Sequence, residues 1–397
     1  MDKNNIIGFS LIAAVLIGYY IWSQPSAEQV ATQKQKDSIE NVARMKAENA
    51  AKLAAQQKTA QAKAAAEADT TALFHAALQG KAQDVTLKNK DLSLTLNTKG
   101  GVVTKAVIKN FEDRNDNKDV TLFDGKTQSL NFALAAKSVN INTADLYFTP
   151  SERTDSTVTM TAEAGKGKAL IIRYRLGSDY MLHTQLQAVG LGGDFAPSAT
   201  QMDVQWKDLI RQQERGFTFE NRYSSLTYHK ADGGTDYLSE AKEVKDETIE
   251  KKIDWVAFKN QFFSAVMIAK NDFAENAVMT SIPQEKGSGY LKQYEAKMKT
   301  FFDPTGATPS EFDFYFGPND FRLLKRIEKE CSFNKDLEMQ RLVYLGWPLF
   351  RIINRWFTIY VFDFLTGLNI NMGIVLILIT LLLKLITYPM VKKSYMS

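Results

Sequence analysis

Three hydrophobic patterns divide the 397-residue chain. An uncharged apolar run covers residues 6–22. Apolar and polar residues then alternate through many short segments between residues 84 and 316. A second apolar run covers residues 371–390, and it contains one charged side chain, Lys384. The patterns predict a membrane-anchored all-β domain combined with α-helical transmembrane segments.

The alternation is clearest in DVTLKNKDLSLTLNTKGGVVTKAVIKNF, residues 84–111. Apolar residues recur at every second position, which predicts antiparallel strands with one buried face. The positions expected to be buried are Val85, Leu87, Leu92, Leu94, Leu96, Val103 and Val107. Gly100 and Gly101 supply a turn that needs positive φ. Because similar segments follow for more than two hundred residues, residues 82–333 are predicted to form one large β-sandwich.

The segment GPNDFRLLKRIEKEC, which follows the last predicted strand, has the period of a helix. Its apolar side chains share one face and its charges take the other, which predicts an amphipathic helix. The apolar positions are Phe321, Leu324 and Ile327.

Two further helices are predicted near the end of the chain. Residues 346–366 are amphipathic, so this helix is expected to lie in the plane of a membrane interface. Residues 371–390 are long and apolar enough to cross ~30 Å of hydrocarbon. With one crossing, Lys392 and Lys393 lie on the cytoplasmic side, as the positive-inside rule prefers.

The N-terminal run fits either a cleaved signal peptide or an uncleaved signal anchor. Residues 6–22 end in the interfacial aromatics Tyr19, Tyr20 and Trp22. The run exceeds the ~7–15 residues of a signal-peptide core, which favours an uncleaved anchor over residues 1–26. Lys3 marks the start of the chain as cytoplasmic.

A spacer is predicted over residues 27–81, which are rich in Ala, Gln, Lys and Glu. These residue types favour helix but supply almost no large apolar side chains for a core. A coiled coil requires sustained apolar heptads, which the segment lacks. We therefore expect a solvated, partly helical spacer outside the membrane.

Composition and motifs reveal little candidate chemistry. The net charge of +4, without a basic cluster interleaved with aromatics, argues against a nucleic-acid partner. The single cysteine, Cys331, has no partner for an internal disulfide. The histidines His75, His183 and His229 lie far apart without a metal-binding spacing, and no nucleophile elbow, P-loop or dinucleotide fingerprint occurs. Residues 113–124 loosely imitate a calcium loop, but a polar hairpin loop is favoured because the required glycine is absent. We expect no cofactor, no metal and no enzymatic activity.

The chain resembles the YidC/Oxa/Alb family of membrane protein insertases, in its Gram-negative form. Five ordered segments carry the resemblance: TKGGVVTKAVIKNF (98–111), WVAFKNQFF (255–263), FYFGPNDFRLLK (314–325), GWPLFRIINRWF (346–357) and NMGIVLILITLLLKLITYPMVKKSYMS (371–397). The last segment is the most diagnostic, because the family has a positive charge shortly before a Tyr/Phe-Pro pair. Here Lys384 precedes Tyr388 and Pro389. The family residue is usually arginine, so this chain departs in residue type while keeping the charge.

The resemblance implies a periplasmic β-supersandwich with a helix at its end, followed by an insertase core of five spans. Residues 334–397 would begin that core, and Tyr388 and Pro389 would mark the end of its first span. The chain stops at Ser397, so a fragment that lacks four spans is expected. The implied location is the bacterial inner membrane, with the N-terminus in the cytoplasm and the large domain in the periplasm.

The resemblance also implies the function. Lys384 would line a hydrophilic groove within the membrane and attract the polar or acidic tail of an inserting protein. The implied partners are newly made inner-membrane proteins, the lipid bilayer, the Sec translocon and the ribosome.

The residues alone leave other interpretations open. Lys384 lies one to two turns from the predicted cytoplasmic boundary, so it also fits a snorkelling side chain that reaches the headgroups. The protein would then be a membrane-tethered module that binds carbohydrate or peptide. An envelope hydrolase without recognisable site residues is a third hypothesis. The sequence beyond Ser397 discriminates the first two hypotheses, and activity screening tests the third.

Overall fold

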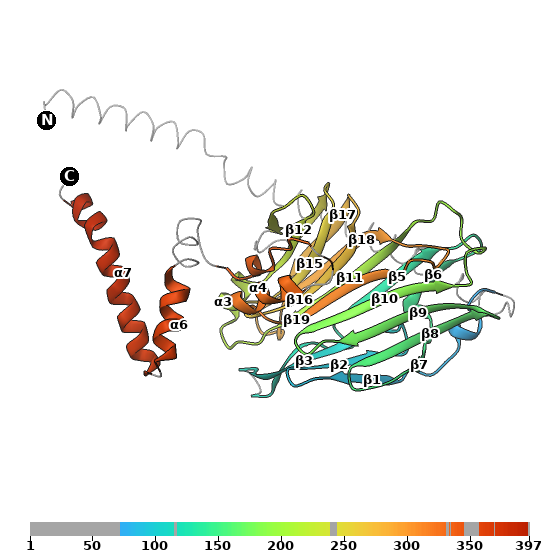
Figure 1. Cartoon of the computed structure of the whole chain (residues 1–397), viewed down its shortest axis with the longest axis horizontal. Helices are drawn as coiled ribbons and strands as arrows, with labels where there is room; N and C mark the ends of the chain where they lie inside the picture. Colours follow the sequence, from blue (N-terminus) through green and yellow to red (C-terminus); the bar gives the residue numbers. More distant parts are fainter. Residues whose placement is uncertain are drawn as a thin grey trace, which may run out of the picture. The chain divides into compact units, whose positions relative to one another are not determined.

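The structure is a computed structural model that describes residues 72–397 apart from 115–116, 239–243, 331–332, 334, 345–356, 369 and 396–397. The predicted anchor (1–26) and most of the predicted spacer (27–81) therefore lie outside the described residues. The described chain consists mainly of antiparallel strands, followed by helices (Figure 1). The predicted all-β class of the large domain is confirmed.

A four-stranded sheet, in the order β1-β2-β3-β4, begins the domain. Its strands are β1 Asp84–Lys88, β2 Leu92–Asn97, β3 Val102–Glu112 and β4 Asp119–Phe123. The alternation predicted for β1 and β2 is confirmed, because every second side chain is buried. Gly100 and Gly101 join β2 to β3 with φ values of 84° and 66°. A Cβ atom on Gly101 would lie 2.9 Å from the Phe148 ring, so both conformation and space require glycine there.

The prediction for Val107 was wrong. β3 has a β-bulge at Thr104. The two residues that flank Thr104 pair with consecutive residues of β2, so Thr104 itself has no pairing partner there. One extra residue exchanges the two faces of a strand. Ala106 and Ile108 are therefore buried, and Val107 is only half-buried.

The second sheet has 15 strands, and all of its pairings are antiparallel. Its main path runs β6-β5-β11-β18-β16-β19-β10-β9-β8-β7. From β18 it extends through β17 to β14, and from β16 through β15 and β12 to β13. The bounds are β5 Ser129–Ala135, β6 Asn140–Asn142, β7 Thr149–Ser151, β8 Thr157–Gly165, β9 Lys168–Leu176, β10 Met181–Val189, β11 Gln201–Arg211, β12 Ser225–Lys230, β13 Thr235–Tyr237, β14 Lys245–Ile249, β15 Ile253–Lys259, β16 Phe263–Phe273, β17 Ala277–Pro283, β18 Tyr290–Phe301 and β19 Ser310–Pro318.

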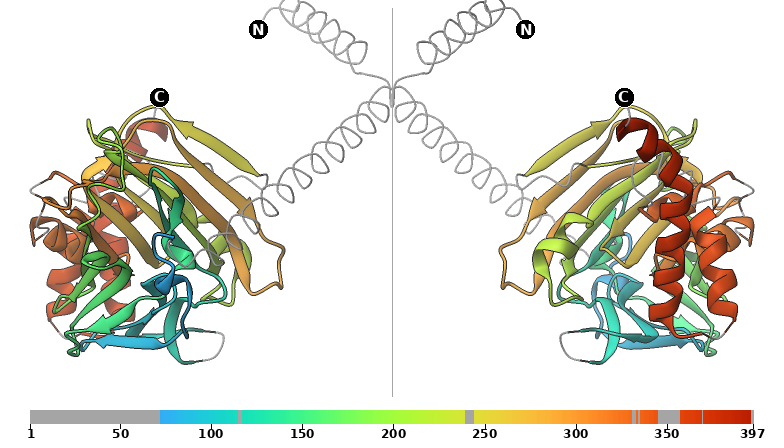
Figure 2. Two further views of the ribbon diagram at one scale, coloured as in Figure 1. Left: turned by 90° about the vertical axis from the view of Figure 1, so that its right-hand side faces the viewer. Right: turned by 90° about the vertical axis from the view of Figure 1, so that its left-hand side faces the viewer.

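Aromatic side chains fill the core between these layers. Trp206 of β11 stacks on Phe258 of β15, with ring centroids 4.0 Å apart, which joins two arms of the large sheet. Phe123 of β4 meets Phe316 of β19 edge to face at 5.5 Å, which joins the small sheet to the large one. Figure 2 shows the small sheet against the curved large sheet. This arrangement confirms the β-supersandwich fold class.

The predicted helix at the end of the domain is confirmed as α4, Phe321–Glu330. Asp320 caps it, because its Oδ1 accepts a hydrogen bond of 2.7 Å from the Leu323 N–H. Leu324 and Ile327 are buried, as their shared face predicts. The remaining helices are η1 Ala76–Leu78, η2 Thr143–Asp145, α3 Phe217–Arg222, η3 Met339–Leu342, α6 Ile359–Gly367 and α7 Met372–Tyr395.

The end of the predicted spacer belongs to the β domain. Phe74 and Ala77 are buried in the same core as the strands. The Ala77 carbonyl accepts a hydrogen bond of 2.6 Å from the Tyr147 N–H. The boundary between spacer and β domain therefore lies before residue 81. The sequence did not indicate this, because Phe74 is an isolated aromatic in an alanine-rich segment without alternating apolar residues.

Candidate functional site

The three predicted site residues, Lys384, Tyr388 and Pro389, all lie in α7. Asn371 starts this helix: its Oδ1 accepts a hydrogen bond of 2.8 Å from the Gly373 N–H. The helix continues past Pro389 to its end at Tyr395, so the proline does not terminate it, and proline within a helix commonly produces a kink instead.

No helix within the described residues combines the length and the apolar content that a membrane crossing requires. The span over residues 371–390 and its terminus stay predictions. So does the interfacial helix over 346–366, because 345–356 lie outside the described residues and α6 covers only Ile359–Gly367.

Two faces of α7 differ in chemistry. Val375 and Ile379, four residues apart, are buried in a contact between α7 and α6. Thr380, Lys384 and Tyr388 follow one another at the same spacing, about 140° around the helix from that contact, and all three are exposed. Polar groups thus form a stripe on a helix that is otherwise apolar from Met372 to Leu385.

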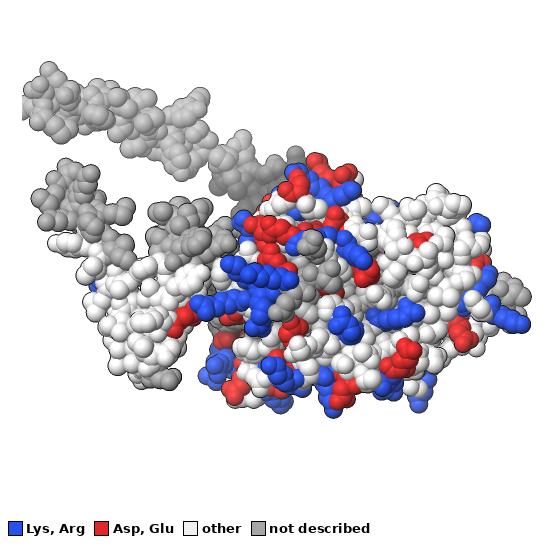
Figure 3. Space-filling view, in the orientation of Figure 1, with Lys and Arg blue, Asp and Glu red and all other residues white. Residues whose placement is uncertain are grey.

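The rest of the exposed surface of α7 is strongly hydrophobic. Ile377, Leu381 and Leu385 are 58–77% exposed. Figure 3 shows this region almost without charged side chains, whereas charges are scattered over the β domain. A large exposed apolar surface marks contact with lipid or with another protein segment.

A second feature is the segment 335–342 that follows α4, here called the strap. The prediction that this segment begins the insertase core (334–397) is wrong, because the strap packs into the core of the β domain. The Trp255 indole N–H donates a hydrogen bond of 2.7 Å to the Leu337 carbonyl, and the Lys335 ammonium donates one of 2.8 Å to the Ala269 carbonyl. The buried side chains of the strap are Leu337, Met339 and Leu342.

His229 lies beneath the strap and contacts it. Its Nδ1 lies 2.9 Å from Asp254 Oδ1, and its Nε2 lies 3.5 Å from Glu338 Oε2 of the strap. Burial alone lowers the pKa of His229, but the hydrogen bond and charge of Asp254, together with Glu338, raise it above its ordinary value. A cavity of about 560 Å³ adjoins these groups and is also lined by Asp232, Asp336 and Arg341. The residues are distant in sequence, so no motif could have identified them.

The other histidines form no metal centre with their neighbours. His183 Nδ1 lies 2.6 Å from Asp313 Oδ1, which pairs a half-buried ring with a buried carboxylate. Among residues 72–397 as described, no group of three or more potential ligands is arranged to hold a metal ion. The polar stretch 113–124 is part of the β3–β4 hairpin, as predicted.

Comparison with known proteins identifies close sequence relatives. A family model described as the YidC periplasmic domain matches residues 84–360. The membrane protein insertase YidC of Phocaeicola vulgatus is 46% identical over 399 residues, covering 100% of this chain and 63% of the relative. The protein of the same name from Bacteroides fragilis is 41% identical, with the same coverage. The chain thus spans 63% of the length of these relatives.

Solved structures overlap the chain less closely. The crystal structure of YidC from Thermotoga maritima gives a TM-score of 0.34 at 13% identity, covering 79% of this chain and 70% of that chain. A galactose mutarotase-like protein from Lactobacillus casei gives 0.39 at 11% identity, covering 59% and 100%. TM-scores this low support no conclusion about function.

Proposed function

This chain belongs to the YidC family of membrane protein insertases, and we propose that it helps to insert and fold inner-membrane proteins, with α7 as one wall of a polar groove in the membrane. The relatives are named insertases and not enzymes, and the proposed reaction changes no covalent bond. Because the chain spans 63% of these relatives, the groove would need segments beyond those described.

The observation that carries this proposal is the stripe of Thr380, Lys384 and Tyr388 on an otherwise apolar helix. A charge at the centre of a membrane span costs ~2.5–3.5 kcal/mol when nothing compensates it. Such a charge therefore usually faces a protein interior or water instead of lipid. The stripe lies away from the packed contact with α6, so a further helix could cover it and leave a wet space between the two.

The role of the ammonium group follows from electrostatics. A hydrophilic tail that crosses hydrocarbon must desolvate its peptide and charged groups, at several kcal/mol for each unsatisfied group. A half-channel filled with water shortens the apolar path. A fixed cation at Lys384 attracts a carboxylate part of the way across, while the apolar segment of the substrate moves sideways into lipid.

The remaining proposals concern location and partners. The β domain would lie in the periplasm of a Gram-negative cell, and the protein would be held in the inner membrane with its N-terminus in the cytoplasm. Newly made inner-membrane proteins would be its substrates. The Sec translocon and the ribosome would be its partners for larger substrates.

Substitution of Lys384 in a chain extended to the length of its relatives tests the proposal. Lys384→Arg should retain insertion of a small substrate with an acidic translocated tail, and Lys384→Ala should impair it. The measurement is the accessibility of the tail to protease outside the membrane, at matched expression. Leu385→Ala, one residue away on the apolar surface, is the control. A snorkelling lysine instead predicts full insertion in Lys384→Ala.

A further inference from the structure

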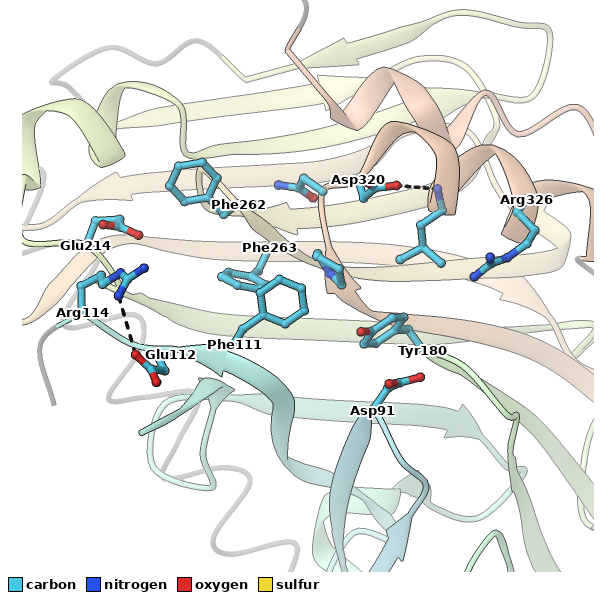
Figure 4. A pocket seen from close by; sticks show the side chains of 13 residues that line it. Asp91, Phe111, Glu112, Arg114, Tyr180, Glu214, Phe262, Phe263, Asp320 and Arg326 are labelled. Carbon is cyan, nitrogen blue, oxygen red and sulfur yellow. Dashed lines mark hydrogen bonds and ion pairs between the residues drawn. The ribbon is translucent and has the colours of Figure 1, made fainter. Parts of the chain in front are cut away.

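An aromatic groove of about 600 Å³ lies on the β domain, outside the proposed membrane site. Phe111 from β3 and Phe262 from the β15–β16 turn are 38% and 46% exposed, beside the buried Phe263 (Figure 4). The volume falls within the ~300–1,000 Å³ typical of ligand sites. Two exposed phenylalanines around one cavity mark a binding surface, because water solvates aromatic faces poorly.

The backbone holds Phe111 in the groove. Between Ile108 and Glu112, β3 carries extra residues that have no partner on β4, and Asn110 adopts a left-handed φ of 66°. The Phe111 ring then meets the edge of Phe263 at 5.4 Å. Bulges and left-handed residues commonly aim a side chain at a functional site.

Hydrogen bonds fix Phe262 in the same way. The Asn260 Oδ1 accepts hydrogen bonds of 3.0 Å and 2.7 Å from the N–H groups of Phe262 and Phe263. The Phe262 carbonyl accepts a further bond of 2.6 Å from the Asn319 N–H, just before α4. The groove is therefore preorganised, which lowers the entropic cost of binding.

Charge decides what the groove accepts. Six charged side chains line it, four acidic and two basic, which gives a net charge of −2. The acidic residues are Asp91, Glu112, Glu214 and Asp320, and the basic ones are Arg114 and Arg326. Glu112 and Arg114 lie 3.7 Å apart at one end, and Asp320 caps α4 at the other. The negative surplus disfavours an anionic lipid surface, and it also disfavours a second copy of the same groove.

We propose that this groove binds an extended peptide segment of another protein, one that combines aromatic or aliphatic anchors with lysine or arginine. The anchors pack against Phe111 and Phe262, and the basic side chains reach the acidic rim. Large anchors in a preorganised pocket contribute most of the binding energy in such contacts. The groove thus favours basic segments, whereas Lys384 is proposed to attract acidic ones, so the two sites select different parts of a protein.

The test measures binding of a fluorescein-labelled peptide to the whole chain in detergent by fluorescence anisotropy. The probe alternates tryptophan and leucine with lysine, and its counterpart has glutamate in place of each lysine. The lysine probe should bind saturably and more tightly than the glutamate probe. Phe262→Ala and Phe111→Ala should weaken its binding roughly tenfold or more. Glu214→Gln should weaken it less and reduce its salt dependence.

Matched variants distinguish binding in the groove from adhesion of the probe to any exposed aromatic or charged side chain. Phe219→Ala removes an aromatic that is 55% exposed and does not line the groove, and Lys384→Ala removes the proposed membrane cation; both variants should bind the probe like the parent. Phe262 is half-exposed, so its substitution should leave the fold intact. Equal binding of the two probes would overturn the proposal. So would unchanged binding in both phenylalanine variants, or binding of phosphatidylglycerol vesicles that depends on Phe262 while the peptide does not bind.

Discussion

Replacing Trp255 with phenylalanine isolates one contact that holds the strap on the β domain. The indole N–H donates a hydrogen bond of 2.7 Å to the Leu337 carbonyl, and both residues are fully buried. Phenylalanine keeps an aromatic ring over His229, whose own ring lies parallel to that of Trp255 with centroids 5.8 Å apart. It leaves the carbonyl without its donor, at a cost of about 1–3 kcal/mol. The equilibrium constant for opening the strap should therefore rise roughly 5- to 150-fold.

Hydrogen exchange monitored by mass spectrometry measures this opening directly. In Trp255→Phe, the amides of the strap (335–342) should exchange faster in proportion to that rise, while those of β9 and β10 keep their parental rates. Trp206→Phe is the control, because Trp206 stacks on Phe258 within the core instead of contacting the strap. Parental exchange of the strap in Trp255→Phe would refute the assigned role of this hydrogen bond. Equal acceleration of the strap in both variants would refute it as well.

Three further predictions concern titration and packing. The raised pKa of His229, caused mainly by Asp254 and further by Glu338, means that the protonated ring contributes stability that is fully present below about pH 6.5 and is lost as pH rises through the raised value; the free energy of unfolding should fall with pH over that interval in the parent, and Asp254→Asn should reduce this dependence more than Glu338→Gln. Burial raises the pKa of Asp208 from 3.8 to about 8, so folding is penalised progressively as pH rises from about 4 to about 8; Asp208→Asn should therefore change the melting temperature little below about pH 4 and raise it most above about pH 8, and an equal effect at both ends would contradict the assignment. Leu324→Ala, at a fully buried position of α4, should lower the free energy of unfolding by about 2–5 kcal/mol, measured by urea denaturation; a loss well below that range would mean that the helix is not anchored there.

Local pattern was sufficient where neighbouring residues determine the structure. The alternation around Leu94 predicted a strand with one buried face, and the spacing of Leu324 and Ile327 predicted the buried face of α4. Both depend on side chains within one or two turns or pleats of each other. The prediction failed at Val107, because the bulge at Thr104 exchanges the buried and exposed faces of β3. No glycine or proline at the bulge indicates it in the sequence.

The candidate sites were less predictable, because their contacts join distant parts of the chain. Lys384 stood out because a single charge interrupts an apolar run. His229 and Glu338 are brought together only when the strap folds back on the sheet. Phe111 and Phe262 are ordinary strand and turn aromatics in the sequence, and only the assembled sheets show that both remain exposed around one cavity.

A charge exchange between Lys384 and the substrate tests the proposed insertion mechanism most directly. Insertion would be measured by protease accessibility of the tail, in a chain extended to the length of its relatives. The parent should insert a substrate with an acidic tail better than the same substrate with a lysine tail. Lys384→Glu should reverse that preference, because the sign of the interaction reverses at a site where charges are weakly screened. If Lys384→Glu keeps the parental preference, Lys384 does not attract the translocated tail and the proposed mechanism is wrong.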